Sequence, residues 1–179
     1  MKKICAILLI TSSNFSHAQK KFNLKNIDAG FGVFSVLLKN SPKENESGGL
    51  TANLNTAFAL DKHLFSLNFI RGGGVAGGYV SIGGDFKFYK IDILYGRGFN
   101  IFNWLAFDIN AGIGYYNQNS NTYFTDDEIK KSTVNFPIKM SLVFLQHRRI
   151  GLGINSNYDI NKLNNTFSGN LFLRYNFIK

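Results

Sequence analysis

The sequence has 179 residues and a formal net charge of +9, and 45% of its residues are hydrophobic and 15% aromatic. This length suits a single domain, and the single cysteine excludes an internal disulfide framework. So many aromatic side chains exclude an intrinsically disordered chain. No uninterrupted apolar run approaches the roughly 20 residues that a membrane-spanning helix needs.

The first 18 residues have the composition of a secretory signal peptide. A basic start is followed by an apolar stretch from Ile4 to Ile10. Ser16-His17-Ala18 then places small residues at the two positions that a signal peptidase reads. We therefore expect cleavage after Ala18, export of the chain, and one mature domain formed by residues 19–179.

From residue 29 onward the hydropathy alternates with a period of two, which is typical of β-strands. Leu50, Ala52 and Leu54 share one face of such a strand, and Thr51 and Asn53 lie on the other. In the first strand the pattern leaves open which face is the apolar one. The alternation predicts eight strands, at residues 29–39, 50–60, 63–71, 79–95, 104–116, 132–145, 150–158 and 166–179.

The connections between these strands alternate in length. Residues 61–62 and 146–149 are short turns, and 96–103 is longer than the other turns on that side. The longer connections are residues 40–49, 72–78, 117–131 and 159–165. Thr125 to Glu128 fits a capping box, so we expect one helical turn in the third long loop.

Two kinds of eight-stranded barrel fit this pattern. A soluble ligand-binding barrel turns its apolar face inward, whereas an outer-membrane barrel turns it to lipid and closes, because an open sheet edge cannot be hydrated in hydrocarbon. Strand length, an even strand number and the alternating connections favour lipid. So do glycines on the polar faces, where a narrow interior needs small residues; these are Gly112, Gly114, Gly151 and Gly153. We predict an all-β fold, an eight-stranded antiparallel up-and-down transmembrane β-barrel without a wide pore.

Several charged residues also fall on the polar faces of the predicted strands. Inside a closed barrel they would be shielded from lipid, and opposite charges could pair there, since unpaired buried charges are costly. The predicted interior charge network consists of Lys90, Asp92, Asp108, Lys139 and Arg174.

The signal peptide, the amphipathic strands and the last strand, Leu171-Phe-Leu-Arg-Tyr-Asn-Phe-Ile-Lys179, resemble small outer-membrane β-barrel families. The closest in shape are OmpX-like proteins and the membrane domain of OmpA-like proteins. This architectural resemblance covers essentially the whole mature chain. It implies a place in the outer membrane, insertion by the outer-membrane assembly machinery, and a structural, surface-binding or adhesion role. In such families the last residue is usually aromatic, whereas Phe177 here is third from the end.

Two other functions stay open at this point. One is a soluble periplasmic lipocalin-like barrel with an apolar ligand inside, although the early Gly-x-Trp of lipocalins is missing. The other is an outer-membrane lipid-modifying enzyme, which would need a nucleophile beside a base. His63, Ser66 and His147 all fall at the short-turn end, and the His-x-Ser pattern of deacylase relatives is absent. We therefore expect a protein that is not an enzyme.

The remaining motifs give weak signals for ligands. Asp126-Asp127-Glu128 lacks EF-hand spacing, and Gly72 to Gly78 lacks the ending of a phosphate loop. Scattered basic residues do not form a nucleic-acid patch. We expect no metal, no cofactor, no nucleic acid and a monomer. Four lysines of the predicted outer loops are either solvated or attracted to lipopolysaccharide phosphates; these are Lys43, Lys130, Lys131 and Lys162.

Overall fold

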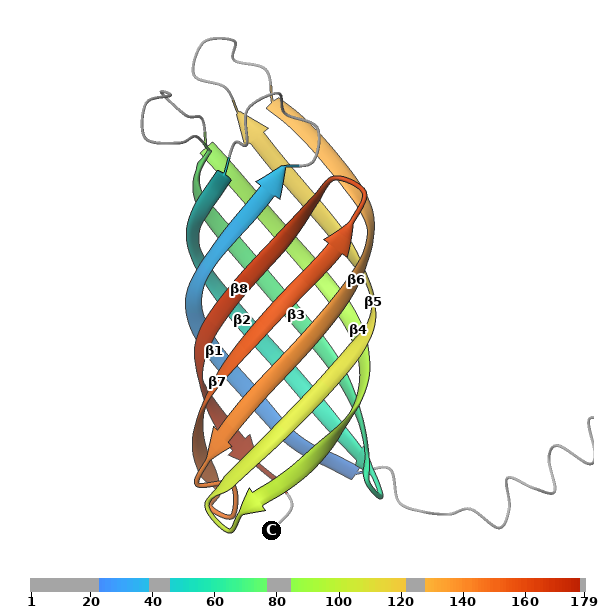
Figure 1. Ribbon diagram of the computed structural model, residues 1–179, viewed down its shortest axis with the longest axis vertical. Coiled ribbons are helices and arrows are strands. Elements are labelled where there is room, and N and C mark those ends of the chain that lie inside the picture. Colours follow the sequence, from blue (N-terminus) through green and yellow to red (C-terminus); the bar gives the residue numbers. More distant parts are fainter. Residues whose placement is uncertain (1–22, 39–45, 77–84, 122–127, 178–179) are drawn as a thin grey trace, which may run out of the picture.

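The computed structural model describes residues 23–38, 46–76, 85–121 and 128–177, so the predicted signal peptide lies outside the described residues. Each strand pairs antiparallel with the next, and the first pairs with the last, which closes a barrel (Figure 1). The strands are β1 (Asn23–Leu38), β2 (Glu46–Leu60), β3 (His63–Ala76), β4 (Asp85–Phe102), β5 (Leu105–Asn121), β6 (Glu128–Phe144), β7 (Ile150–Asn161) and β8 (Asn164–Asn176). The predicted up-and-down barrel of eight strands is confirmed.

No helix within the described ranges is long and apolar enough to cross a membrane.

The barrel has two different ends. At one end, called the turn end, residues 61–62, 103–104 and 145–149 connect the strands, and β8 ends there as well (Figure 1). At the other, called the loop end, Lys162-Leu163 joins β7 to β8. The other three connections of the loop end lie outside the described residues.

Five predicted connections are wrong at their boundaries. Of residues 159–165 only Lys162-Leu163 connect the strands, in a tight turn instead of a long loop, because Asn161 Oδ1 accepts hydrogen bonds from the backbone N–H groups of Leu163 and Asn164, at 2.9 and 3.0 Å. Residues 96–102 continue β4, and residues 72–76 continue β3, where Gly74 pairs with Gly49 of β2. Residues 46–49 begin β2, and residues 117–121 and 128–131 belong to β5 and β6. Of the expected helical turn, only Glu128 is described, and it begins β6.

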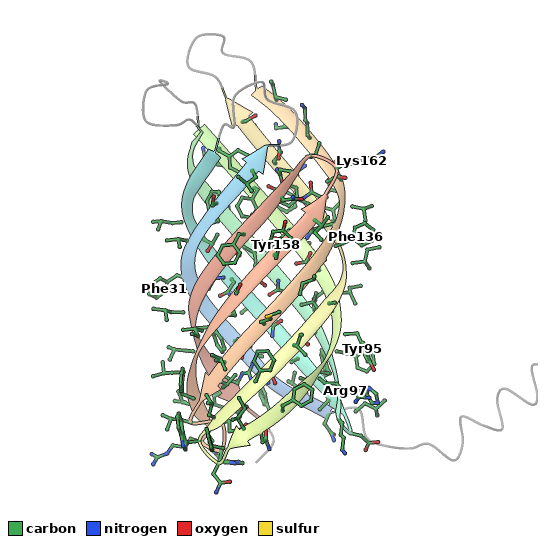
Figure 2. All side chains as sticks on the ribbon, viewed as in Figure 1. Phe31, Tyr95, Arg97, Phe136, Tyr158 and Lys162 are labelled. Carbon is green, nitrogen blue, oxygen red and sulfur yellow. The ribbon has the colours of Figure 1, made fainter. Side chains whose placement is uncertain are left out.

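The outer wall of the barrel is apolar, as an outer-membrane barrel requires and a soluble barrel does not. Phe31 and Leu50 are 70% and 72% exposed, whereas Asn68 and Asn135 on inward faces are fully buried. Figure 2 shows side chains projecting from the wall all around, with Phe31 and Phe136 among them. The apolar face therefore points away from the interior, which favours the membrane barrel over the lipocalin-like alternative.

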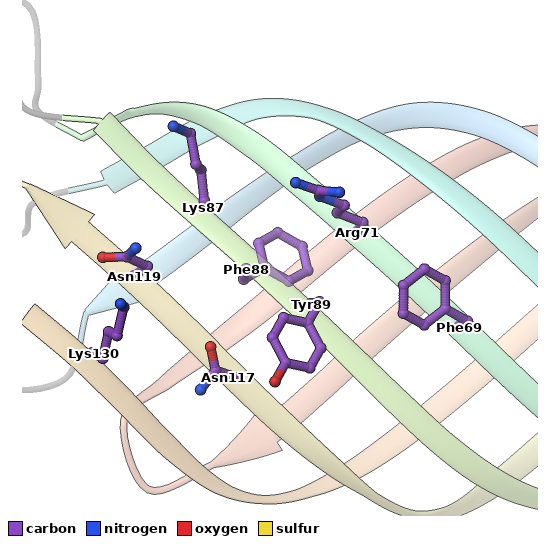
Figure 3. Close-up of a pocket in the computed structure, with 8 residues that line it drawn as sticks. All are labelled: Phe69, Arg71, Lys87, Phe88, Tyr89, Asn117, Asn119 and Lys130. Atoms are coloured by element: carbon purple, nitrogen blue, oxygen red, sulfur yellow. The ribbon is translucent and has the colours of Figure 1, made fainter.

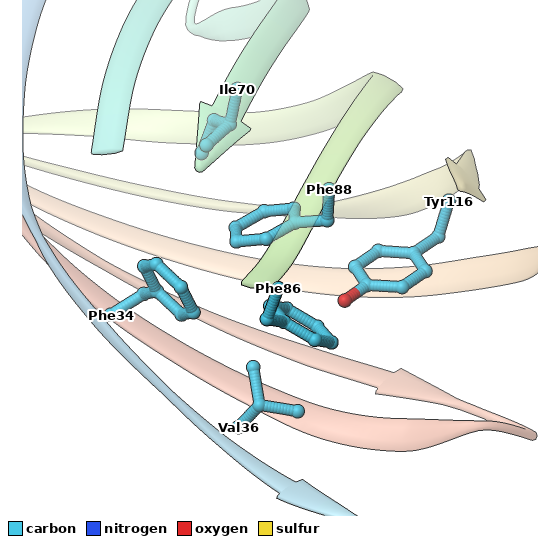
Figure 4. Close-up of a cluster of buried hydrophobic side chains, with 6 residues drawn as sticks. All are labelled: Phe34, Val36, Ile70, Phe86, Phe88 and Tyr116. Carbon is cyan, nitrogen blue, oxygen red and sulfur yellow. The ribbon is translucent and has the colours of Figure 1, made fainter. Parts of the chain in front are cut away.

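The interior changes character along the barrel. Near the loop end six side chains from four strands point toward one another (Figure 4). We call this group the apolar plug: Phe34, Val36, Ile70, Phe86, Phe88 and Tyr116. The rest of the interior is largely polar. The plug settles the ambiguity of the first strand, since Phe34 and Val36 face inward while Phe31 and Val33 face outward.

Inward-facing glycines make room for the large side chains of the interior. A Cβ atom on Gly72 would overlap the ring of Phe88, and one on Gly153 would overlap the ring of Phe172. A Cβ atom on Gly112 would overlap the carbonyl oxygen of Ile93 on β4, and one on Gly114 would overlap the carboxylate of Asp92. The narrow barrel is thus filled by pairing large residues with glycine on neighbouring strands.

Candidate functional site

The first half of the interior charge network lies around Lys90. Its Nζ donates to Asp159 Oδ1 and Oδ2 at 2.6 and 2.7 Å and lies 3.3 Å from Asp92 Oδ2. Asn135 Nδ2 donates to Asp92 Oδ1 at 3.1 Å and to Asp159 Oδ1 at 2.8 Å. These four residues are fully buried. One ammonium and one amide thus hold two carboxylates that water does not reach.

The second half lies around Arg174, nearer the turn end. Its Nε and Nη2 donate to the two oxygens of Asp28 at 2.7 and 3.0 Å, and its Nη1 donates to Asp108 Oδ2 at 2.9 Å. Asn55 Nδ2 also donates to Asp28, at 3.2 Å. Asp28 and Arg174 face each other across the β1–β8 pairing that closes the barrel. The ion pair therefore reinforces the closing seam.

Lys139 is the remaining member of the predicted network. Its Nζ donates to Asn68 Oδ1 at 3.2 Å, and Asn68 Nδ2 donates to Asp92 at 3.2 Å. All five predicted residues face inward, but sequence reasoning missed two carboxylates to which they bind. Asp28 and Asp159 each lie one residue beyond a predicted strand end, so extending the alternation by one position would have found them.

The residues considered for catalysis do not come together. Ser66 is buried inside the barrel, whereas His63 lies on the outer face, where its Nδ1 is 2.6 Å from the hydroxyl of Tyr95. His147 lies in the turn between β6 and β7. Among the described residues, no group of histidine, cysteine and carboxylate side chains is arranged to hold a metal ion.

A second candidate site lies on the outer wall near the loop end. Lys87, Asn119 and Lys130 form a row across β4, β5 and β6, because Asn119 pairs with both lysines. Arg71 on β3 also faces outward, and its cross-strand partner is Tyr89. We call Arg71, Lys87 and Lys130 the rim site.

The rim site lies at the upper edge of the apolar wall. Arg71 on β3, Tyr89 on β4 and Asn117 on β5 lie side by side in one row. Two residues further toward the turn end, each of the strands β3 to β6 carries an exposed apolar or aromatic side chain. These are Phe69, Ile91, Tyr115 and Val134. Phe69, Tyr89 and the cations line a shallow hollow of about 360 Å³ (Figure 3). The cations therefore adjoin a surface that hydrocarbon would cover.

A second hollow lies on the other side of Arg71 and Lys87. It measures about 490 Å³, and its floor includes Gly73, which has no side chain to fill it. Phe31 and Leu50 line its apolar part, while Arg71 and Lys87 line its edge. Each hollow thus combines an apolar wall, suited to an acyl chain, with cations suited to a phosphate.

The lysines predicted from the sequence fall in different places. Lys43 lies outside the described residues. Lys130 belongs to the rim site, whereas Lys131 pairs with the buried Gln118 and so lies on the opposite face of β6. Lys162 lies in the β7–β8 turn at the loop end (Figure 2).

Arg71 and Lys87 fall inside the predicted strands 63–71 and 79–95, but their side chains were not singled out as a site. Alternation with Leu67 and Phe69 would have placed Arg71 on the outer face.

Comparisons with known proteins agree on the fold. No protein-family model matches the sequence, and no curated protein matches it. Among solved structures, Neisserial surface protein A is similar over 85% of this chain and 96% of its own, with 11% identity and a TM-score of 0.68. The outer membrane protein OprG from Pseudomonas aeruginosa is similar over 89% and 99%, with 9% identity and a TM-score of 0.58.

Ail, the attachment invasion locus protein of Yersinia pestis, is similar over 88% of this chain and 100% of its own, with 14% identity and a TM-score of 0.56. At such low identities these similarities show the fold. The chain has the fold of the small eight-stranded outer-membrane β-barrels, and its apolar exterior is of the outer-membrane type.

Proposed function

We propose that this protein is a non-enzymatic integral protein of the outer membrane that binds lipopolysaccharide phosphates at its rim site. The observation that carries the proposal is the position of Arg71, Lys87 and Lys130. They face outward at the boundary between an apolar wall and a polar loop end, and two amphipathic hollows flank Arg71 and Lys87.

The chemistry of the rim site suits a phosphorylated lipid. A guanidinium forms paired hydrogen bonds with phosphate oxygens, and an ammonium adds a point charge. Acyl chains from the same lipid would cover Phe69 on one side and Leu50 on the other. Lipopolysaccharide carries both groups and lies in the outer leaflet, which the loop end of such a barrel faces.

The interior supports a structural or surface-binding role instead of transport. Ion pairs fill the middle of the barrel, and the apolar plug fills the end below the loops. An eight-stranded barrel has an interior just wide enough for side chains. The exposed surface, and not a channel, is therefore the part that meets partners.

The test is binding of purified lipopolysaccharide to the refolded barrel. The Arg71→Gln/Lys87→Gln double variant should raise the apparent Kd about thirtyfold, because each cation near a charged lipid surface contributes roughly 1 kcal/mol. Lys62→Gln/Arg149→Gln removes the same charge at the turn end and should change the Kd little. Equal binding by the rim variant, or by dephosphorylated lipopolysaccharide, would refute the proposal.

A further inference from the structure

A second cluster of polar side chains lies on the outer wall near the turn end. His63 on β3 and Arg97 on β4 are cross-strand partners, and Tyr95 lies two residues along β4 on the same face. The His63 and Tyr95 rings stack with their centroids 5.6 Å apart, and His63 Nδ1 lies 2.6 Å from the Tyr95 hydroxyl. Phe65 packs on Tyr95 at 5.3 Å. We call His63, Tyr95 and Arg97 the turn-end site.

The turn-end site lies one membrane thickness away from the rim site. Lys87 and Arg97 face outward on the same strand, ten residues apart. That spacing is about 34 Å along the strand and about 26 Å along the barrel axis at a tilt of about 40°. Since the apolar band of such barrels is about 25 Å tall, Arg97 falls at the level of the opposite headgroups. Figure 2 shows Tyr95 and Arg97 in the half of the barrel away from Lys162.

Arg97 is surrounded by lipid-type surface. Toward the loop end it is followed by Tyr95 and Ile93, beside it lies Ile109, and Phe99 follows toward the turn end. All four neighbours are exposed apolar or aromatic side chains. Among the described residues, Arg97 makes no ion pair. A guanidinium in these surroundings would be stabilised by an anion from the lipid headgroups.

We propose that the turn-end site binds the phosphate of an anionic glycerophospholipid in the leaflet opposite to lipopolysaccharide. Arg97 supplies two parallel N–H donors to the phosphate oxygens. With the hydrogen of the neutral imidazole on Nε2, His63 Nδ1 accepts the hydroxyl hydrogen of Tyr95, and Nε2 is a further donor beside Arg97. Tyr95 is thus a positioning residue. This inference rests on the barrel standing in a bilayer, and not on lipopolysaccharide binding at the rim site.

A tryptophan moved to the lipid-facing wall beside the site reports on this leaflet. Trp104, the single tryptophan, lies in the β4–β5 turn beyond the headgroup level of Arg97, so it is replaced by phenylalanine. Ile93 faces outward four residues from Arg97 toward the loop end and is 66% exposed, and Ile93→Trp/Trp104→Phe is the reporter protein. The barrel is reconstituted with increasing fractions of a phospholipid brominated on its acyl chains, and the tryptophan emission is recorded. Brominated phosphatidylglycerol is compared with brominated phosphatidylcholine, which has the same acyl chains and phosphate but a cationic headgroup.

We expect phosphatidylglycerol to reach half-maximal quenching at an about fivefold lower fraction than phosphatidylcholine, which is the effect of one cation at an anionic lipid surface. Arg97→Gln should remove this preference, and Tyr95→Phe, which keeps the ring, should reduce it in part. Arg149→Gln, which removes an exposed cation from the β6–β7 turn, should leave the preference unchanged.

The outcomes separate the two proposals. A preference that survives Arg97→Gln, or that disappears in Arg149→Gln, overturns the turn-end site. Equal quenching by both lipids in the reporter protein without further changes also overturns the turn-end site, while the membrane location stands. If neither lipid quenches the tryptophan of Ile93→Trp/Trp104→Phe, the barrel does not lie in the bilayer, and the proposed function fails as well.

Discussion

Replacing Arg174 with glutamine tests whether the ion pairs hold the closed barrel together. The guanidinium makes hydrogen bonds of 2.7, 3.0 and 2.9 Å to Asp28 and Asp108, and all three residues are at most 5% exposed. Without the guanidinium, the carboxylates of Asp28 and Asp108 stay buried without their cation. Among the described side chains, the Asn55 amide at 3.2 Å is then the hydrogen-bond donor that Asp28 keeps. Removing one partner of a buried ion pair costs about 3–5 kcal/mol, so Arg174→Gln should lower the free energy of unfolding by that amount.

The assay is reversible denaturant unfolding of the barrel in lipid vesicles, followed by Trp104 fluorescence. Asp28→Asn/Arg174→Gln should be more stable than Arg174→Gln alone, because the double variant also removes the buried negative charge of Asp28 that Arg174→Gln leaves without its cation. Lys62→Gln, in an exposed turn, should change stability by less than about 0.5 kcal/mol. A loss below about 1 kcal/mol for Arg174→Gln would refute the reasoning, since it would mean that the carboxylates do not need this partner.

Three further predictions concern the wall and the filling of the barrel. In washed membranes, the protein should migrate differently on gels before and after boiling, and identical mobility would argue against a closed barrel. Leu54→Arg, in the middle of the lipid-facing wall, should cost about 2–4 kcal/mol in the same unfolding assay, whereas Leu60→Arg near the turn end should cost about 0–1; equal costs would contradict the assigned depth. Gly72→Val should destabilise by about 1–3 kcal/mol because it collides with Phe88; in a Phe88→Ala background, which itself removes a buried ring of the apolar plug, the same change should cost little, and an undiminished cost there would place the collision elsewhere.

The faces of the strands were predictable because alternation follows directly from strand geometry. Leu50 and Thr51 point to opposite sides in any regular strand. What had to be inferred was whether the outer face of the barrel meets lipid or water. Strand ends were less predictable, because glycine gives no hydropathy signal. Gly72 to Gly74 were interpreted as a loop, yet they pair with β2, where small residues allow close approach.

The partners within the charge network could not be predicted from alternation alone. Inward-facing positions follow from the sequence, but which of them meet depends on how far neighbouring strands are shifted along one another. Lys90 reaches Asp159 across 69 positions of sequence, and this contact follows from the stagger of the closed barrel. The rim site was missed for a related reason, since its row joins residues of three strands.

The pairing of Asp28 with Arg174 also sets the order of events during membrane insertion. The two residues are 146 positions apart and meet only when the last strand docks on the first. Until then, Asp28 and Asp108 lack the cation that neutralises them, and a charge facing hydrocarbon is costly. A partly wound sheet would turn these unpaired charges toward hydrocarbon, so their pairing at the seam favours closure of the barrel together with full entry into the bilayer.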